Sequence, residues 1–179
     1  MSLRLIRRWT CDRRGVAAVE FALVLPALLA LYLGGYEAEQ CVSINRKLDL
    51  TTSELGNVVS QYTSMQTTDV STVFNASAQI MAPYSTSNLT IVLSEVQTDT
   101  NSNATVTWSQ AYGGATALTK QAKVVMPAGL AQPSTTYMLV QTAYAYSPTV
   151  GAGFFPKVPL ASQLYILPRA SASIPCSSC

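Results

Sequence analysis

Hydrophobic and polar positions divide the first third of the chain into two consecutive helical segments. Val16 to Tyr36 is a run of 21 residues with a single charge, Glu20. A helix needs about 20 apolar residues to cross a bilayer, whereas the apolar core of a signal peptide has only about 7–15. After Tyr36, apolar residues recur every three, four or seven positions, which predicts that the helix continues over 37–62 and packs one face on a sheet. That stripe consists of Cys41, Ile44, Leu48, Leu55, Val59 and Tyr62.

A second helix and a pair of strands are expected next. Val70, Val73 and Phe74 begin a helical pattern that predicts a helix over 69–81, with Asp69 as its N-cap and Pro83 as its stop. Beyond Pro83 the hydrophobic period changes to two, which predicts strands at 89–97 and 104–110. The polar sequence 99–103 between them is typical of a turn, so we expect a hairpin.

The remainder alternates between loops and strands. Residues 111–135 are rich in glycine and proline and form an irregular excursion, with a short helix or strand near 118–126. Strands are predicted at 136–146 and 161–167, and a loop at 147–159 separates them. The fold class is therefore α+β, with a long N-terminal helix packed on an antiparallel sheet of about four strands. The predicted organisation is a basic leader at 1–15, a transmembrane helix at 16–36 and an extracytoplasmic domain at 37–179.

The distribution of charge indicates the orientation of that helix. The net charge of the chain is only +2, but residues 1–15 contain five arginines and one aspartate, which leaves 16–179 with a net charge of −2. Positive residues beside one end of a membrane span stay in the cytoplasm. The N-terminus should therefore be cytoplasmic and the rest outside. We interpret the basic cluster as a topology signal and expect no nucleic-acid partner.

Residue usage argues against an enzyme. The chain contains no histidine, which removes the commonest general base and a common metal ligand. No phosphate-binding loop or metal-ligand cluster is evident, so neither a cofactor nor a metal is expected. The candidate disulfide pair is Cys176 and Cys179, and pairing of Cys41 between chains is the alternative. A thiol enzyme using Cys176 and Cys179 is disfavoured, because the sequence lacks the βαβ setting of thioredoxin-like motifs.

Glu20 is the anomaly of the apolar run. A carboxylate in a bilayer costs on the order of 2.5–3.5 kcal/mol by insertion scales and is a functional candidate by default. Cleavage after Gly15 would give Val16 a free α-ammonium one helical turn from Glu20 and so create a cationic partner. The alternative is an interfacial glutamate that is tolerated because its side chain reaches the membrane surface.

Residues 13–26, RRGVAAVEFALVLP, resemble the processing site of type IV pilins and most closely the TadE-like pseudopilins of the Flp/Tad tight-adherence system. The basic pair, Gly15, the spacing to Glu20-Phe21 and Pro26 carry the resemblance. Looser similarity to that family occurs at residues 75–84, 143–148 and 164–169. The resemblance implies a pilin-like fold and a minor structural or assembly subunit of a Flp/Tad type IV pilus for surface adhesion.

The same resemblance implies how the chain is processed and where it works. A prepilin peptidase would cut between Gly15 and Val16, and Glu20 and Phe21 would serve recognition and assembly. The protein would be a single-pass protein of the bacterial inner membrane with a periplasmic C-terminal domain. Its partners would be the membrane, the peptidase and other pilin and pseudopilin subunits. Whether it enters the filament stays open. The alternative function is an uncleaved, signal-anchored extracytoplasmic binding protein.

Overall fold

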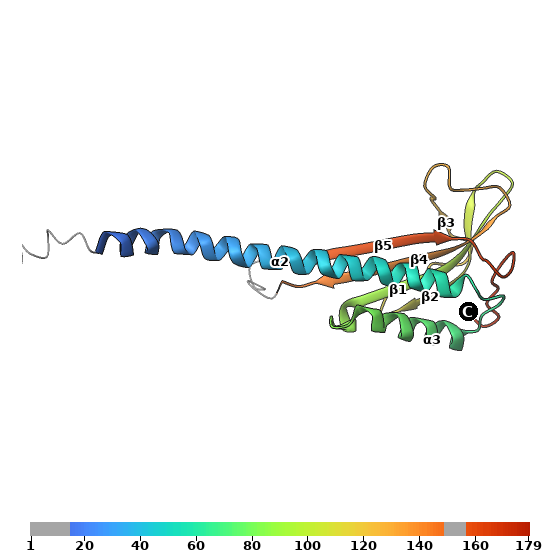
Figure 1. The fold of residues 1–179 in the computed structure, drawn as a ribbon. Coiled ribbons are helices and arrows are strands. Elements are labelled where there is room, and N and C mark those ends of the chain that lie inside the picture. The colour runs from blue at the N-terminus through green and yellow to red at the C-terminus, as the bar shows by residue number, and fades with distance from the viewer. Residues whose placement is uncertain (1–14, 149–156) are drawn as a thin grey trace, which may run out of the picture. The chain divides into compact units, whose positions relative to one another are not determined.

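The structure is a computed structural model that describes residues 15–148 and 157–179 (Figure 1). The leader other than Gly15, and residues 149–156 of the predicted loop, therefore lie outside the described residues. Contacts divide the chain into two units, residues 1–40 and 41–179. The described elements are the helices α2 (Val16–Val59) and α3 (Thr67–Ala78), the 3-10 turns η2 (Gln79–Met81) and η3 (Thr86–Asn88), and the strands β1 (Leu89–Thr98), β2 (Ala104–Tyr112), β3 (Lys123–Val124), β4 (Thr136–Tyr146) and β5 (Val158–Ile166). This composition confirms the predicted α+β fold.

Helix α2 is one uninterrupted helix of 44 residues. It joins the two segments that the hydrophobic pattern predicted separately and runs through Pro26. In the second unit its buried side chains include Ile44, Leu48, Leu55 and Val59, which are the core of the predicted stripe. The period of three and four residues therefore identified the packed face correctly.

The five strands form one antiparallel sheet in the order β3-β2-β1-β4-β5. The predicted hairpin is confirmed, because β1 pairs with β2 from Thr98↔Ala104 to Ile91↔Tyr112. On its other side β1 pairs with β4, and β4 pairs with β5 from Tyr146↔Val158 to Met138↔Ile166. The fifth strand is β3, two residues long, which forms within the irregular excursion where a short element was expected.

Several predicted boundaries were wrong, among them the end of α2, which lies at Val59 rather than at residue 62. Two others have a clear physical reason. Helix α3 has Gln66 rather than Asp69 as its N-cap. Asp69 lies three residues later, where its carboxylate accepts the Gln66 N–H at 2.9 Å, as the partner in a capping box. Strand β5 begins at Val158, before Pro159, although Pro159 was assigned to the preceding loop. An edge strand tolerates proline because one side of its backbone needs no ladder hydrogen bond.

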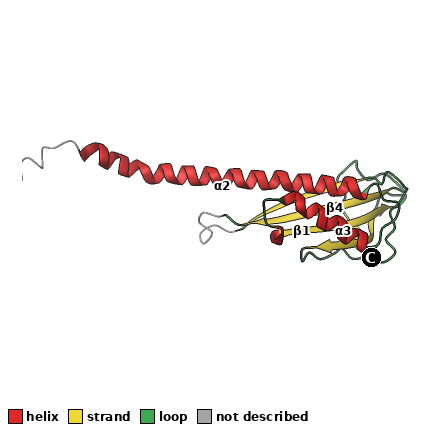
Figure 2. Ribbon diagram, turned by 60° about the horizontal axis from the view of Figure 1, so that its bottom comes forward, coloured by secondary structure: helices red, strands yellow, loops and turns green. Residues whose placement is uncertain are grey.

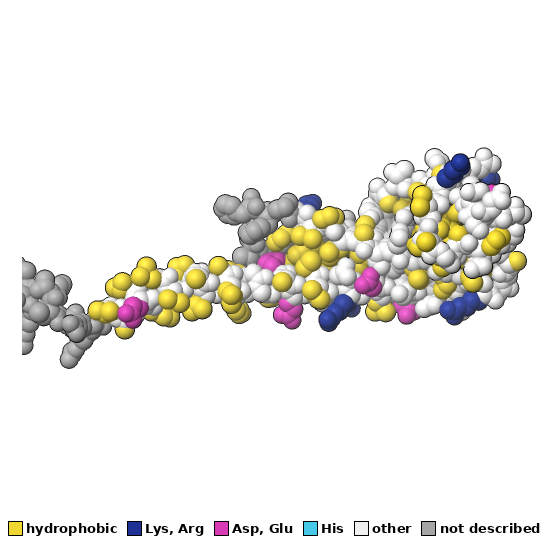
Figure 3. Space-filling model, turned by 90° about the horizontal axis from the view of Figure 1, so that it is seen from above, with side chains coloured by type: hydrophobic (Ala, Val, Ile, Leu, Met, Phe, Trp, Pro, Cys, Tyr) yellow, Lys and Arg dark blue, Asp and Glu magenta, His cyan; other side chains and the backbone are white. Residues whose placement is uncertain are grey.

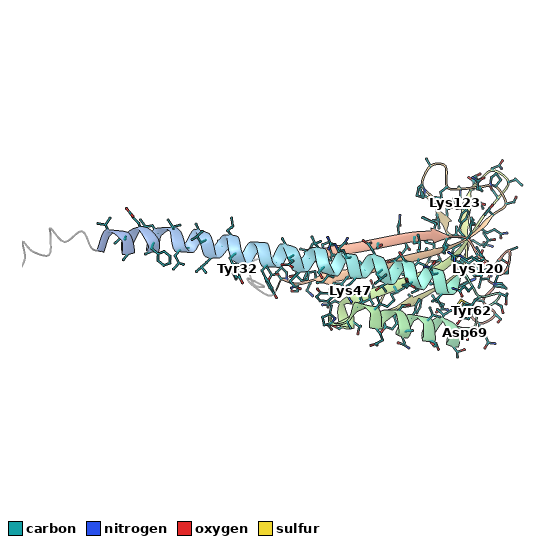
Figure 4. The ribbon with its side chains drawn as sticks, viewed as in Figure 1. Tyr32, Lys47, Tyr62, Asp69, Lys120 and Lys123 are labelled. Carbon is teal, nitrogen blue, oxygen red and sulfur yellow. A yellow bond between two sulfur atoms is a disulfide. The ribbon has the colours of Figure 1, made fainter. Side chains whose placement is uncertain are left out.

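Residues 41–59 of α2 and helix α3 cover the same face of the sheet (Figure 2). They share one core with sheet residues such as Leu93 and Val140. The hydroxyls of Thr52 and Thr142 are 2.6 Å apart and hydrogen bond across this interface. Lys47, labelled in Figure 4, ties α2 to the segment after α3 by donating to the carbonyl of Ala82 at 2.8 Å.

Gly56 sets how closely α2 approaches the sheet. A Cβ atom at this position would lie 3.0 Å from Leu164 Cδ2, 3.6 Å from Ile166 Cγ2 and 3.7 Å from Val140 Cγ2. Glycine lowers the helix propensity of the segment. The structure adds that the missing side chain makes room for β4 and β5.

The second face of the sheet carries a smaller core. Val96, Ala104 and Leu139 are buried there. Leu118, Val124 and Met126, all from the excursion between β2 and β4, pack against them. The excursion therefore covers part of the face that the helices leave open.

Candidate functional site

The start of α2 holds the four residues that the sequence identified as the processing and assembly site. Gly15 immediately precedes the helix and Val16 is its first residue. A Cβ at Gly15 would meet no atom within 4 Å. The side chains of Val16 and Phe21 are 51% and 60% exposed, and Glu20 is also exposed. Within the described residues, this segment is open to an enzyme or to another subunit.

Glu20 lies one helical turn beyond Val16, because four residues advance an α-helix by about 6 Å. Among the described residues, no hydrogen bond or ion pair involves its carboxylate. Positions four apart share a helix face. Val16 and Glu20 therefore lie on one face of the helix, as the sequence predicted. The Glu20 carboxylate accepts no hydrogen bond from the described part of the chain.

The apolar stretch of α2 is exposed along its length. Its most apolar 18-residue window contains no buried residue, and Leu23, Leu31 and Tyr32 are each more than 70% exposed. Hydrophobic side chains cover this part of the helix in Figure 3, and Tyr32 points away from the helix axis in Figure 4. A soluble monomer rarely presents so continuous an apolar surface. This helix is long and apolar enough to cross a membrane and suggests a membrane anchor.

The second feature of interest is the C-terminal strap, residues 169–179, in the unit 41–179. Its first residue donates its backbone N–H to the Ser60 carbonyl at 2.7 Å. Further along, the Met65 N–H donates to Pro175 O at 3.0 Å, and the Ser177 N–H donates to Met65 O at 3.3 Å. The strap is thus fastened to the connection between α2 and α3.

Cys176 and Cys179 are joined by a disulfide in the structure, with their Cα atoms 5.5 Å apart. The bridge closes a short loop within the strap. Cys41 is half-buried on α2 and is a free thiol. Pairing of Cys41 between two chains is not tested by a single chain and stays a prediction.

Glu95 is a buried residue that the sequence analysis assigned only to a strand. It is 2% exposed, and its Oε1 accepts the Ile174 N–H at 2.7 Å. The Trp108 indole N–H donates to the Ile174 carbonyl at 2.8 Å. One residue of the strap is therefore held through both of its backbone polar groups.

The alternation of buried and less buried positions along β1 is the sequence signal that could have identified Glu95. Alternate residues of a strand point to the same face of the sheet. The buried positions Leu89, Ile91 and Leu93 are followed in this series by Glu95. A charged residue that continues a series of buried apolar positions indicates a buried polar contact.

Burial raises the pKa of the Glu95 carboxyl above its ordinary value, because a carboxylate loses hydration inside the protein. The hydrogen bond from the Ile174 N–H and the nearby indole of Trp108 act in the opposite direction but more weakly. Among the described residues, no group of three or more His, Cys, Asp or Glu side chains is placed to hold a metal ion. The hydrogen bond that this carboxylate accepts from the Ile174 N–H fastens the strap to β1.

Comparison with known proteins bears on the start of α2. Residues 15–38 match the family model described as TadE-like protein. No curated protein and no solved structure matches the chain. The matched segment begins at Gly15 and contains Val16, Glu20 and Phe21, so it coincides with the exposed start of the helix. The resemblance to TadE-like proteins is therefore confirmed over this segment of the chain.

Proposed function

We propose that this chain is a TadE-like pseudopilin, a minor structural or assembly subunit of a Flp/Tad type IV pilus that serves surface adhesion. The observation that carries the proposal is the family match at residues 15–38, in which Gly15, Glu20 and Phe21 stand at the exposed start of a long apolar helix. In this proposal the protein is the substrate of a peptidase and is not itself an enzyme.

Processing would remove residues 1–15. A prepilin peptidase would cut between Gly15 and Val16, where the backbone is accessible and no neighbouring atom crowds the glycine. The new N-terminus would be the α-ammonium of Val16. Glu20 would pair with the α-ammonium of a neighbouring subunit and so set the register of two helices during assembly.

Topology follows from the arginines of the leader, which favour a cytoplasmic N-terminus. Residues 16–36 would then anchor the protein in the bacterial inner membrane, and 37–179 would lie in the periplasm. There the α+β domain would contact other pilin and pseudopilin subunits.

The test is Gly15→Val in bacterial cells that co-express a Tad prepilin peptidase. A side chain at the scissile glycine should crowd the peptidase, so the variant should accumulate as a full-length membrane precursor. Mass spectrometry of the purified protein gives its N-terminal residue. Gly34→Val is the matched control, because a Cβ at either glycine meets no atom within 4 Å. The control should begin at Val16.

Glu20→Gln tests the role of Glu20 in assembly, and the N-terminal residue of this variant shows whether the peptidase also reads the side chain. The amide keeps the shape of the side chain but loses the charge, which removes part of a charge-assisted hydrogen bond worth roughly 1.5–3 kcal/mol. Recovery of the protein with other pilus subunits, measured by crosslinking in the membrane, should fall. Normal processing of Gly15→Val, or a mature wild-type protein that keeps residues 1–15, would instead support an uncleaved, signal-anchored binding protein.

A further inference from the structure

Strand β5 presents a long, uncharged edge. Its nine residues pair with β4 without a break in register. The strand lies at the end of the sheet, and among the described residues no backbone hydrogen bond joins β5 to any element other than β4. Natural edge strands are usually protected by charges, bulges or prolines. Here only Pro159, near the start, offers such protection.

A groove of about 470 Å³ lies at the far end of this strand. It is lined by Gly129, Leu130, Gln132, Tyr137, Tyr165, Ile166, Leu167 and Arg169. Successive side chains of a strand point to opposite faces of the sheet. Because the consecutive residues Tyr165, Ile166 and Leu167 all line the groove, it borders the end of the strand and is not confined to one face of the sheet.

One wall of the groove is held in place by hydrogen bonds. The Tyr137 hydroxyl donates to the Leu130 carbonyl at 2.7 Å and accepts the Gln132 N–H at 3.1 Å. A wall that is already ordered loses little conformational freedom when a ligand binds. The groove is therefore a preorganised surface with aliphatic side chains and two tyrosines, a residue type that is enriched at protein interfaces.

Among the described residues that line the groove, Arg169 is the only charged one. Its guanidinium donates to Asn57 Oδ1 at 3.3 Å, and it forms no ion pair with any residue that the structure describes. The backbone N–H of Arg169 is held independently by Ser60. An arginine fork matches a carboxylate and binds it through two parallel hydrogen bonds.

We propose that the β5 edge and this groove bind an extended segment of a partner protein that carries an Asp or Glu side chain. The segment adds a strand to β5 through backbone hydrogen bonds, its apolar side chains enter the groove, and its carboxylate pairs with Arg169. A second copy of β5 is a poorer occupant, because β5 contains no acidic residue. The inference goes beyond the proposed function, since it requires neither cleavage at Gly15 nor entry into a filament.

The experiment pans the full-length protein in lipid nanodiscs against a phage-displayed library of random peptides of about 12 residues, long enough to span an added strand. Enriched peptides should share one acidic residue and alternate apolar side chains. The affinity of a selected peptide is then measured by fluorescence anisotropy. Arg169→Gln should weaken binding about 10- to 100-fold, the loss expected for a charge-assisted hydrogen bond. Lys123→Gln removes a cation that does not line the groove and should change affinity less than about twofold.

Two further measurements separate strand addition from simple charge attraction. Hydrogen exchange should show new protection of the amides of β5 when the peptide binds. Arg169→Glu should reject the selected peptide and accept the same peptide with lysine in place of its acidic residue. Failure to enrich any peptide, enrichment without an acidic residue, equal effects of the two glutamine variants, or protection elsewhere than β5 would each overturn the proposal.

Discussion

Replacing Glu95 by alanine should loosen the C-terminal strap while the sheet still forms. The backbone of Glu95 pairs with Trp108 and Met138 in the two neighbouring strands, and these ladders do not need its side chain. The substitution removes the acceptor of the Ile174 N–H, a bond of 2.7 Å between buried groups. Ile174 is fully buried, so water does not readily replace the lost acceptor.

The expected cost follows from that unsatisfied donor. A buried polar group that loses its partner costs about 1–3 kcal/mol of folding free energy. Glu95→Gln should cost less, because the amide oxygen still accepts the Ile174 N–H. The two variants therefore separate the loss of the acceptor from the loss of the charge.

The assay is urea unfolding of the full chain in detergent, followed by the fluorescence of Trp108, which lies against the strap. A Trp9→Phe background removes the other tryptophan of the sequence. The midpoint should shift for Glu95→Ala with little change in the slope. Equal stability of Glu95→Ala and the parent, or a loss in Glu95→Gln as large as in Glu95→Ala, would refute the reasoning.

Three further predictions concern the unit 41–179. Because burial raises the pKa of Glu95, the extra stability that comes from protonating this carboxyl is complete below the ordinary value of 4.5 and is lost as pH rises through the folded pKa, whereas the hydrogen bond from the Ile174 N–H does not need the proton. The difference in unfolding free energy between wild type and Glu95→Gln should therefore change with pH in that window, and a constant difference would contradict it. Gly56→Val should destabilise the domain by about 1–3 kcal/mol through overpacking, whereas Gly34→Val should not. Without reductant, alkylation followed by mass spectrometry should label Cys41 but neither Cys176 nor Cys179, and labelling of all three would exclude the bridge.

The features that the sequence predicted well are those encoded over short distances. The stripe of α2, the alternation of β1 and β2, and the bounds of β4 all depend on side chains within a few residues of one another. The motif from Gly15 to Phe21 is equally local, because its residues follow one another at the start of one helix. The wrong prediction of Asp69 as the N-cap also concerns a local pattern, because aspartate serves either as an N-cap or as the N3 residue of a capping box.

The features that escaped prediction depend on contacts between distant parts of the chain. Glu95 and Ile174 are 79 positions apart, and nothing near either residue indicates the other. The role of Gly56 likewise escaped prediction, because its proximity to Leu164 exists only after β5 has joined the sheet. Local patterns thus predicted the elements, whereas the fastening of the strap and the groove beside Arg169 required the assembled domain.

The C-terminal strap has a consequence for the order of events during biosynthesis. A ribosome makes the chain from its N-terminus, so every helix and strand that the strap covers is synthesised before Ile174. Until then Glu95 lacks its backbone donor and Trp108 lacks its backbone acceptor. The nascent domain therefore exposes to chaperones and proteases the surface that the strap later covers. Docking of the strap buries that surface.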